Sequence, residues 1–212
     1  MPTVHEIESA LFGLAPRELA MDWDNVGLLL GDPAAEVTHV LLSLDVTDAA
    51  AAEAKEKGCQ LIVSHHPLMN VRWHQREMQT LRPDTRLGRL LTTLVKNDIA
   101  VISLHTNLDA APGGVNDALA ASLRLEEPGS LPGDESGICR VGTLKETMAP
   151  ADFAAFVGRT LSAGNVRWCG GRPVRRVAVG GGACGDFIPR VLAAGCDTFV
   201  TSDLSYHQFL DA

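Results

Sequence analysis

The sequence lacks any apolar run long enough to span a membrane, and its first residues, MPTVHEIESALFGLAP, already carry charge. No secretory signal is recognisable there. The five cysteines are odd in number and scattered, and they form no C-x-x-C pair, so a disulfide framework is not indicated. These absences predict a cytoplasmic protein with no membrane association.

The sequence also lacks an excess of positive charge, because it has 18 Lys and Arg against 26 Asp and Glu, which gives a formal net charge of −8. A nucleic-acid-binding surface is therefore not indicated. The arginine-bearing segment 72–89 is a local exception. We interpret it first as a solvated helix face and second as a rim that attracts phosphate-bearing substrates.

An internal repeat organises the chain. The segment 37–66, VTHVLLSLDVTDAAAAEAKEKGCQLIVSHH, aligns without a gap with 174–203, VRRVAVGGGACGDFIPRVLAAGCDTFVTSD, at an offset of 137 residues. Each copy has the pattern strand, helix, strand, with Gly58 or Gly195 where a helix C-cap belongs. This is a βαβ unit, which implies parallel strand pairing and a right-handed crossover.

The duplication predicts an α/β fold of two similar lobes built from βαβ units, with mainly parallel sheets. The Pro-, Gly- and acid-rich stretch 126–137 is the best linker candidate. We therefore expect a first lobe over 1–125 and a second over 138–212.

Polar side chains follow three apolar strands of the first lobe. His65 and His66 end one strand, His105 and Asp109 follow another, and Asp45 ends a third. Ligands of parallel α/β sheets bind outside the carboxyl ends of the strands, so these groups should meet at one edge. Imidazole and carboxylate are ligands of zinc, iron and manganese, and paired divalent ions are a recurring hydrolytic device.

Other motifs have competing interpretations. Asp48, with Thr47, suits a helix N-cap better than a ligand. The Gly-x-Gly-x-x-Gly run at 180–185 fits a tight turn or cavity rim better than a dinucleotide fingerprint. Trp23 is a default core residue, whereas Asp24 and Asn25 could hydrogen-bond around a site.

Several motifs, in order, resemble the dinuclear-metal-centre hexameric proteins known as type 2 GTP cyclohydrolase I homologues, in their short form. They are WDNVGLLLGDP, LIVSHHPL, HTNLDAAPGGVNDALA and VAVGGGACGDFIPRVLAAGCDTFVTSDLSYHQFLDA, and the resemblance covers essentially the whole chain. It implies a homohexameric ring and two divalent metal ions bound by His65, His66 and Asp109. It places His105, Asp24, Asn25 and His207 nearby as outer or substrate-contacting groups.

Members of this family complete the site with a later H-x-x-x-E motif, which is absent up to Ala212. We therefore expect the second lobe to be C-terminally incomplete, and we treat the His207-x-x-x-Asp211 spacing as coincidental. The resemblance implies a metal-dependent hydrolase with a small, nucleotide-like substrate. The alternative is a non-catalytic metal-binding interaction or regulatory ring protein.

Overall fold

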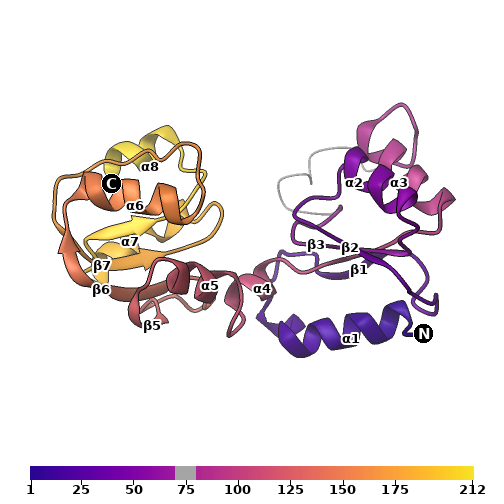
Figure 1. Cartoon of the computed structure of the whole chain (residues 1–212), viewed down its shortest axis with the longest axis horizontal. Helices are drawn as coiled ribbons and strands as arrows, with labels where there is room; N and C mark the ends of the chain where they lie inside the picture. The colour runs from indigo at the N-terminus through magenta and orange to yellow at the C-terminus, as the bar shows by residue number, and fades with distance from the viewer. Residues whose placement is uncertain (70–79) are drawn as a thin grey trace. The chain divides into compact units, whose positions relative to one another are not determined.

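The computed structural model describes residues 1–69 and 80–212, and the chain divides into two compact units, Met1–Leu108 and Asp109–Ala212 (Figure 1). Each unit contains one four-stranded sheet with helices packed on it. The prediction of two α/β lobes is confirmed. No helix among the described residues has both the length and the apolar character needed to cross a bilayer.

The first unit is a three-layer arrangement around the sheet β1-β4-β3-β2. Strands β2, β3 and β4 are parallel, whereas β1 is antiparallel to β4. The short helix α4 (Thr106–Ala110) follows β4 and contains the division between the units. The other elements are α1 (Val4–Leu14), η1 (Arg17–Leu19), β1 (Gly27–Leu30), β2 (Val40–Ser43), α2 (Asp48–Glu56), β3 (Leu61–Ser64), α3 (Arg86–Lys96) and β4 (Ala100–Ser103).

Apolar residues on both faces of this sheet explain its near-continuous hydrophobic strands. Successive strand residues point to opposite faces. Ile62 and Val101 therefore pack with α2 and α3 on one face, while Leu61 and Ile102 pack with Val4 of α1 on the other. The sheet is thus a rigid, buried platform whose strand ends hold the candidate site.

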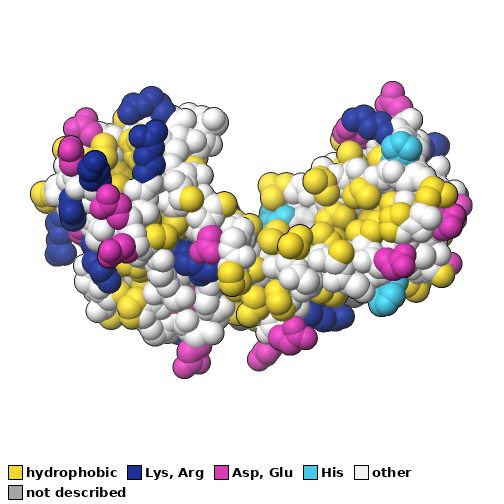
Figure 2. All heavy atoms as spheres, turned by 60° about the horizontal axis from the view of Figure 1, so that its bottom comes forward, with side chains coloured by type: hydrophobic (Ala, Val, Ile, Leu, Met, Phe, Trp, Pro, Cys, Tyr) yellow, Lys and Arg dark blue, Asp and Glu magenta, His cyan; other side chains and the backbone are white. Residues whose placement is uncertain are grey.

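Strand β2 lies at one edge of this sheet and is less covered than its neighbours. Leu42 is 77% exposed and Leu44 is 62% exposed, which is unusual for large apolar side chains. Figure 2 shows hydrophobic side chains gathered on a face of the first unit, with charged side chains mostly toward its margins. The first unit therefore presents an apolar surface as well as a core.

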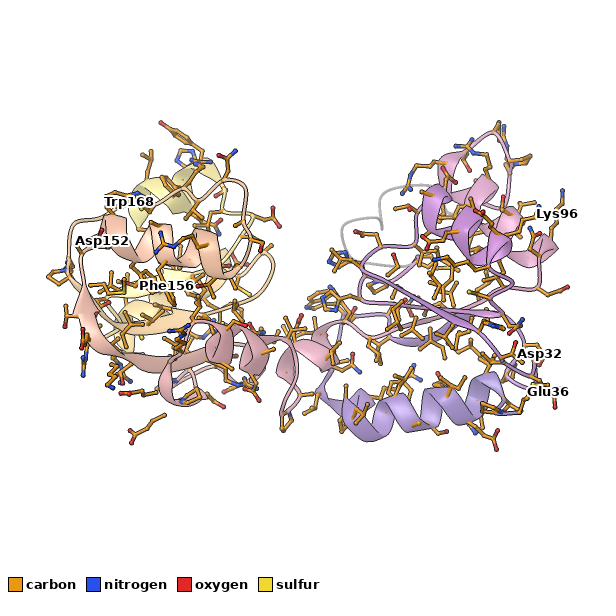
Figure 3. All side chains as sticks on the ribbon, viewed as in Figure 1. Asp32, Glu36, Lys96, Asp152, Phe156 and Trp168 are labelled. Atoms are coloured by element: carbon orange, nitrogen blue, oxygen red, sulfur yellow. The ribbon has the colours of Figure 1, made fainter. Side chains whose placement is uncertain are left out.

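The second unit carries the sheet β5-β6-β7-β8, in which only β7 and β8 are parallel. Phe153 and Val157 of α6 pack on Val177 and Val179 of β7, and Phe156 packs at the margin of this core (Figure 3). The elements are α5 (Val115–Ser122), β5 (Glu126–Ser130), β6 (Arg140–Met148), α6 (Pro150–Thr160), β7 (Val174–Val179), η3 (Gly185–Phe187), α7 (Ile188–Ala193), β8 (Thr198–Val200) and α8 (Tyr206–Asp211).

The internal repeat is confirmed down to its strand register. Val40 pairs with Leu61 in the first unit, and Val177 pairs with Thr198 in the second, which is the same pairing displaced by 137 residues. Gly58 and Gly195 both follow their helices with positive φ, 64° and 69°. Both copies therefore fold as the same parallel βαβ unit.

Two expectations about organisation need correction. Parallel pairing dominates only the first sheet, because β6 is antiparallel to both of its neighbours in the second. The stretch 126–137 is not simply a linker, because it begins with β5, and the division between the units falls at Leu108 and Asp109 instead. Pro128 is tolerated in β5 because that strand lies at the sheet edge, where one side makes no ladder hydrogen bonds.

Candidate metal centre

The register of the parallel strands brings the histidines together. Ser64 of β3 pairs with Ser103 of β4, so the two strands end level, and their hydroxyls hydrogen-bond at 2.8 Å. His65 and His66 follow the first strand end directly, and His105 lies two residues beyond the second. The paired histidines have left the strand, so the alternation of strand faces no longer separates their side chains.

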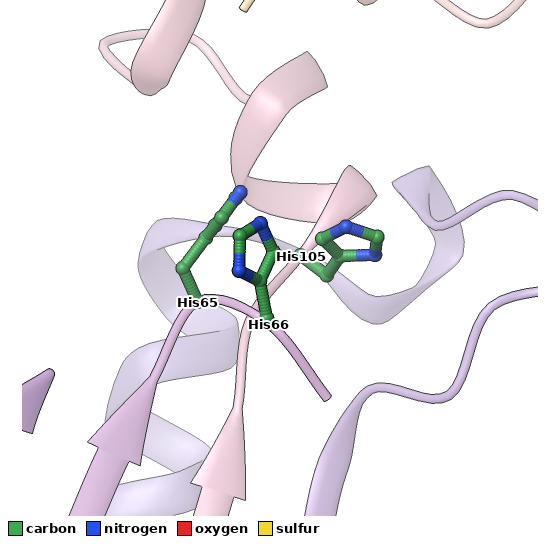
Figure 4. A group of neighbouring side chains, drawn as sticks. All are labelled: His65, His66 and His105. Carbon is green, nitrogen blue, oxygen red and sulfur yellow. The ribbon is translucent and has the colours of Figure 1, made fainter. Parts of the chain in front are cut away.

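His65, His66 and His105 form one cluster (Figure 4). One ring nitrogen from each lies within 4.8 Å of the corresponding nitrogens of the other two. The ring centroids are 5.0 Å apart for His65 and His66, 5.1 Å for His65 and His105, and 5.6 Å for His66 and His105. Three imidazoles therefore converge on one point at the sheet edge.

Oxygen atoms hold the Nδ1 nitrogens of the paired histidines. His65 Nδ1 lies 2.9 Å from the carbonyl oxygen of Leu104, and His66 Nδ1 lies 2.8 Å from Asp45 Oδ1. A carbonyl or carboxylate oxygen accepts hydrogen bonds, so each Nδ1 carries the proton and donates it. Nε2 is then the nitrogen with the lone pair, which is the form that ligates a metal.

The carboxylate of Asp24 accepts the Nδ1–H of His105 in the same way. Its side chain is 0% exposed, and its Oδ1 accepts from His105 Nδ1 at 2.9 Å. Its Oδ2 accepts from the backbone N–H of Thr106 at 3.0 Å and also from the Thr106 hydroxyl. Burial alone would raise the pKa of Asp24, but the hydrogen bonds from His105 and Thr106 outweigh it and lower the pKa to about 2. The carboxylate is therefore ionised and fixes the His105 tautomer.

His65 is kept neutral by its surroundings. Burial, followed by the nearby charges of His105 and His66, lowers the pKa of His65 to about 4. Metal ions bind neutral imidazole, so protons compete poorly for this nitrogen at neutral pH.

The turn that carries Asp24 is hydrogen-bonded to the segments that follow β3 and β4. Met21 N donates to the Thr106 hydroxyl at 2.9 Å, and Asn25 Nδ2 donates to the Met69 carbonyl at 2.7 Å. The indole of Trp23 is half-buried and meets the His105 ring edge-on, with centroids 6.2 Å apart. The turn 21–25 thus supports the cluster from the side, and Trp23 belongs to this region rather than to the deep core.

Two other residues singled out by the sequence belong to the second unit. Asp109 is 8% exposed and opens the second unit, where its backbone carbonyl accepts from Asn116 Nδ2 at 3.2 Å. His207 is exposed on α8. Neither belongs to the three-histidine cluster. Of the arginine-bearing segment, Arg72 and Arg76 lie outside the described residues.

The structure also explains the Thr47–Asp48 pair and the Gly-rich run, which the sequence left open to two interpretations. The Thr47 hydroxyl caps α2 by accepting from Ala50 N at 3.1 Å, while Asp48 is the first helical residue. The Gly-rich run at 180–185 forms a turn after β7, in which Gly182 adopts a φ of 73°. The fold alone accounts for both motifs.

His105 occupies a position that sequence reasoning placed outside the ligand set. Its signal was available in the sequence, because His105 and the paired histidines follow strand ends that a parallel register brings level. Three imidazole nitrogens in one tautomer suit zinc, iron and similar divalent ions. The cluster could therefore hold a metal ion.

Comparisons with known proteins agree with this picture. The sequence matches the profile of the Duf34/NIF3 (NGG1p interacting factor 3) family over residues 2–212. A Clostridium perfringens protein named GTP cyclohydrolase 1 type 2 homolog is 35% identical over 98% of this chain and 80% of its own length. A Streptomyces coelicolor protein of the same name is 38% identical over 100% of this chain and 76% of its own length.

The fold is also shared with solved structures. The crystal structure of a Bacillus cereus protein related to NIF3 superimposes with a TM-score of 0.90 at 25% identity. The superposition covers 100% of this chain and 85% of that protein. Sequence and structure agree over nearly the full length, and the chain belongs to the Duf34/NIF3 family.

Proposed function

We propose that this protein binds divalent metal at the histidine cluster and acts there as a hydrolase on a small, nucleotide-like substrate. The observation that carries the proposal is the shared orientation of the three imidazoles. Each donates Nδ1–H to an oxygen acceptor, so each presents Nε2 as the ligand atom. One ring nitrogen of each histidine lies within 4.8 Å of the other two, which fits the donor set of a metal site.

His65, His66 and His105 would hold one ion. A second ion needs carboxylate oxygens as well, and we propose Asp109 as that ligand. Asp109 lies on α4, which begins directly after His105, so the two residues are four apart in the chain. A bound divalent ion would supply Lewis-acid charge beside the substrate.

This chain's own residues would set up the chemistry. Asp24 and Asp45 orient His105 and His66, and the Leu104 carbonyl orients His65. Trp23 offers a half-buried aromatic ring beside His105 that a planar base could contact. We propose that Asn25 and His207 serve outer positions around the substrate. The nucleotide-like substrate is proposed from the name shared by the bacterial relatives.

The test compares metal-loaded wild-type protein with His65→Ala and Asp109→Ala, using release of product from GTP and from a nucleoside monophosphate. The matched control is His39→Ala, because His39 is exposed and lies outside the cluster. Turnover that falls in both site variants and persists in the control supports the hydrolase. Turnover unaffected by both site variants refutes it.

A non-catalytic ring protein in the cytoplasm is the second candidate, favoured by the exposed apolar edge at Leu42 and Leu44. The family description also names an interacting factor. In this alternative, metal binding stabilises a homohexamer. Turnover and sedimentation, each measured with and without metal, discriminate the two functions. A hydrolase needs metal for turnover whatever its mass, whereas a non-catalytic ring assembled by metal shows no turnover and loses mass when metal is removed.

A further inference from the structure

Two buried cysteines meet within the second unit. Cys139 immediately precedes β6 and is 0% exposed, and Cys184 lies in the turn after β7 and is 6% exposed. Their meeting follows from the sheet register, because Arg140 of β6 pairs with Val179 of β7. Cys139 is therefore brought alongside Gly180, on which Cys184 folds back.

Both sulfurs lie against Gly180. A Cβ at this position would lie 3.0 Å from Cys184 Sγ and 3.1 Å from Cys139 Sγ. The two thiols thus occupy the space that a side chain at Gly180 would take. The turn fixes Cys184 further, because its N–H donates to Gly182 O at 3.1 Å and its thiol donates to Gly181 O at 3.2 Å.

The two thiols differ in acidity. Cys139 hydrogen-bonds to the Cys184 sulfur, and this bond lowers the pKa of Cys184 despite burial. The same bond, together with burial, raises the pKa of Cys139. Cys184 is therefore the more readily ionised of the two thiols and the better nucleophile.

We propose that Cys139 and Cys184 are an oxidation site that closes to a disulfide when the protein meets a peroxide. The Cys184 thiol releases its proton, the thiolate attacks one peroxide oxygen, and the O–O bond breaks. The leaving hydroxide takes up the released proton as the first water, and Cys184 becomes a sulfenic acid. The Cys139 sulfur then attacks Cys184 sulfur, the S–O bond breaks, and the second water carries away the Cys139 proton. Two thiols and one peroxide give one disulfide and two waters. The bond would tie the start of β6 to the turn after β7.

The sequence makes the test direct, because trypsin places each of the five cysteines in a different peptide. Cys139 falls in 125–140 and Cys184 in 177–190. Full-length protein carrying Cys169→Ser, which removes the exposed thiol, is treated with hydrogen peroxide or, separately, with the thiol oxidant diamide. Remaining thiols are alkylated before digestion and mass spectrometry. Cys59 and Cys196 are internal controls, because they are 7% and 5% exposed at equivalent places in the repeat.

We expect both oxidants to produce the linked peptides 125–140 and 177–190, with two thiols lost and Cys59 and Cys196 still alkylated. Cys184→Ser should remove the link and leave Cys139 alkylated. The proposal is overturned if folded protein keeps both thiols after oxidation. It is also overturned if Cys184 advances to sulfinic acid while Cys139 remains reduced. The wild-type cysteine pair decides the matter even where a serine variant folds poorly.

Discussion

Replacing Asp24 by asparagine tests how the buried carboxylate prepares the metal centre. The amide keeps the size of the side chain but removes its charge. Asp24 accepts hydrogen bonds from His105 Nδ1, Thr106 N and the Thr106 hydroxyl, and its side chain is 0% exposed. Asp24→Asn therefore weakens the contact that holds His105 with its lone pair on Nε2.

The size of the effect follows from the structure. Removing an outer partner of a metal-ligating histidine typically weakens metal affinity about 10–100-fold. The pKa of Asp24 is lowered from 3.8 to about 2, and a shift of that size corresponds to roughly 2 kcal/mol of stability. Because the folded pKa is the lower one, this stability is present above pH 3.8 and is lost as the pH falls toward 2.

The assay is calorimetric titration of metal-free protein with zinc, accompanied by chemical unfolding at pH 7. Asp22→Asn is the matched control, because Asp22 is exposed in the same turn. We expect Asp24→Asn to lose both affinity and stability, and the control to lose neither. Unchanged zinc affinity in a folded Asp24→Asn protein would refute the assignment of Asp24 as the group that positions His105.

Three further predictions follow from the geometry. The pKa of His65 is lowered to about 4, so between pH 6.5 and 4 its proton binds the unfolded chain and not the folded one. The free energy of unfolding of the metal-free protein should therefore decrease as the pH is lowered through that window, and His65→Gln should make the decrease smaller. An identical slope in both proteins would contradict this. Gly31→Ala should lower the free energy of unfolding by about 2 kcal/mol or more, because the φ of Gly31 is 110° and the new Cβ would lie 2.5 Å from the Ala100 Cβ. Gly58→Ala has a positive φ but open space around the new Cβ, so it should lower the free energy of unfolding by only about 1 kcal/mol in the same thermal unfolding assay. Equal losses in the two variants would be evidence against the clash. Leu42→Glu should reduce self-association in sedimentation without lowering the melting temperature, because Leu42 is 77% exposed at a sheet edge; an unchanged mass in a self-associating protein would exclude that edge.

Local patterns predicted the fold where the interactions are local. The repeat placed two βαβ units correctly because strand, helix and C-cap glycine lie within about 30 residues, and Gly58 and Gly195 do take positive φ. The antiparallel partners β1, β5 and β6 were not foreseen as such. The β1–β4 and β6–β7 pairs join segments far apart in the chain. Hydrophobic alternation gives no direction for a strand, so the β5–β6 pair, although close in sequence, was not foreseen either.

The candidate site was predictable in part for the same reason. The predicted strand ends identified His65, His66 and Asp45 as site residues, and Asp45 does hydrogen-bond to His66. His105 was expected at the same sheet edge, where β3 and β4 do end level, but the family resemblance had placed it outside the ligand set. The contact of Asp24 with His105 joins residues 81 positions apart and comes from the folded turn alone.

Metal stoichiometry and affinity test the central claim most directly. Metal-free protein is titrated with zinc, and elemental analysis of the dialysed complex is compared among wild type, His66→Ala, His105→Ala and the control His39→Ala. The three-imidazole cluster predicts tight binding in wild type and control, with a large loss of affinity in both cluster variants. Retention of full affinity by folded His105→Ala, or the absence of bound metal in the wild type, would contradict the account.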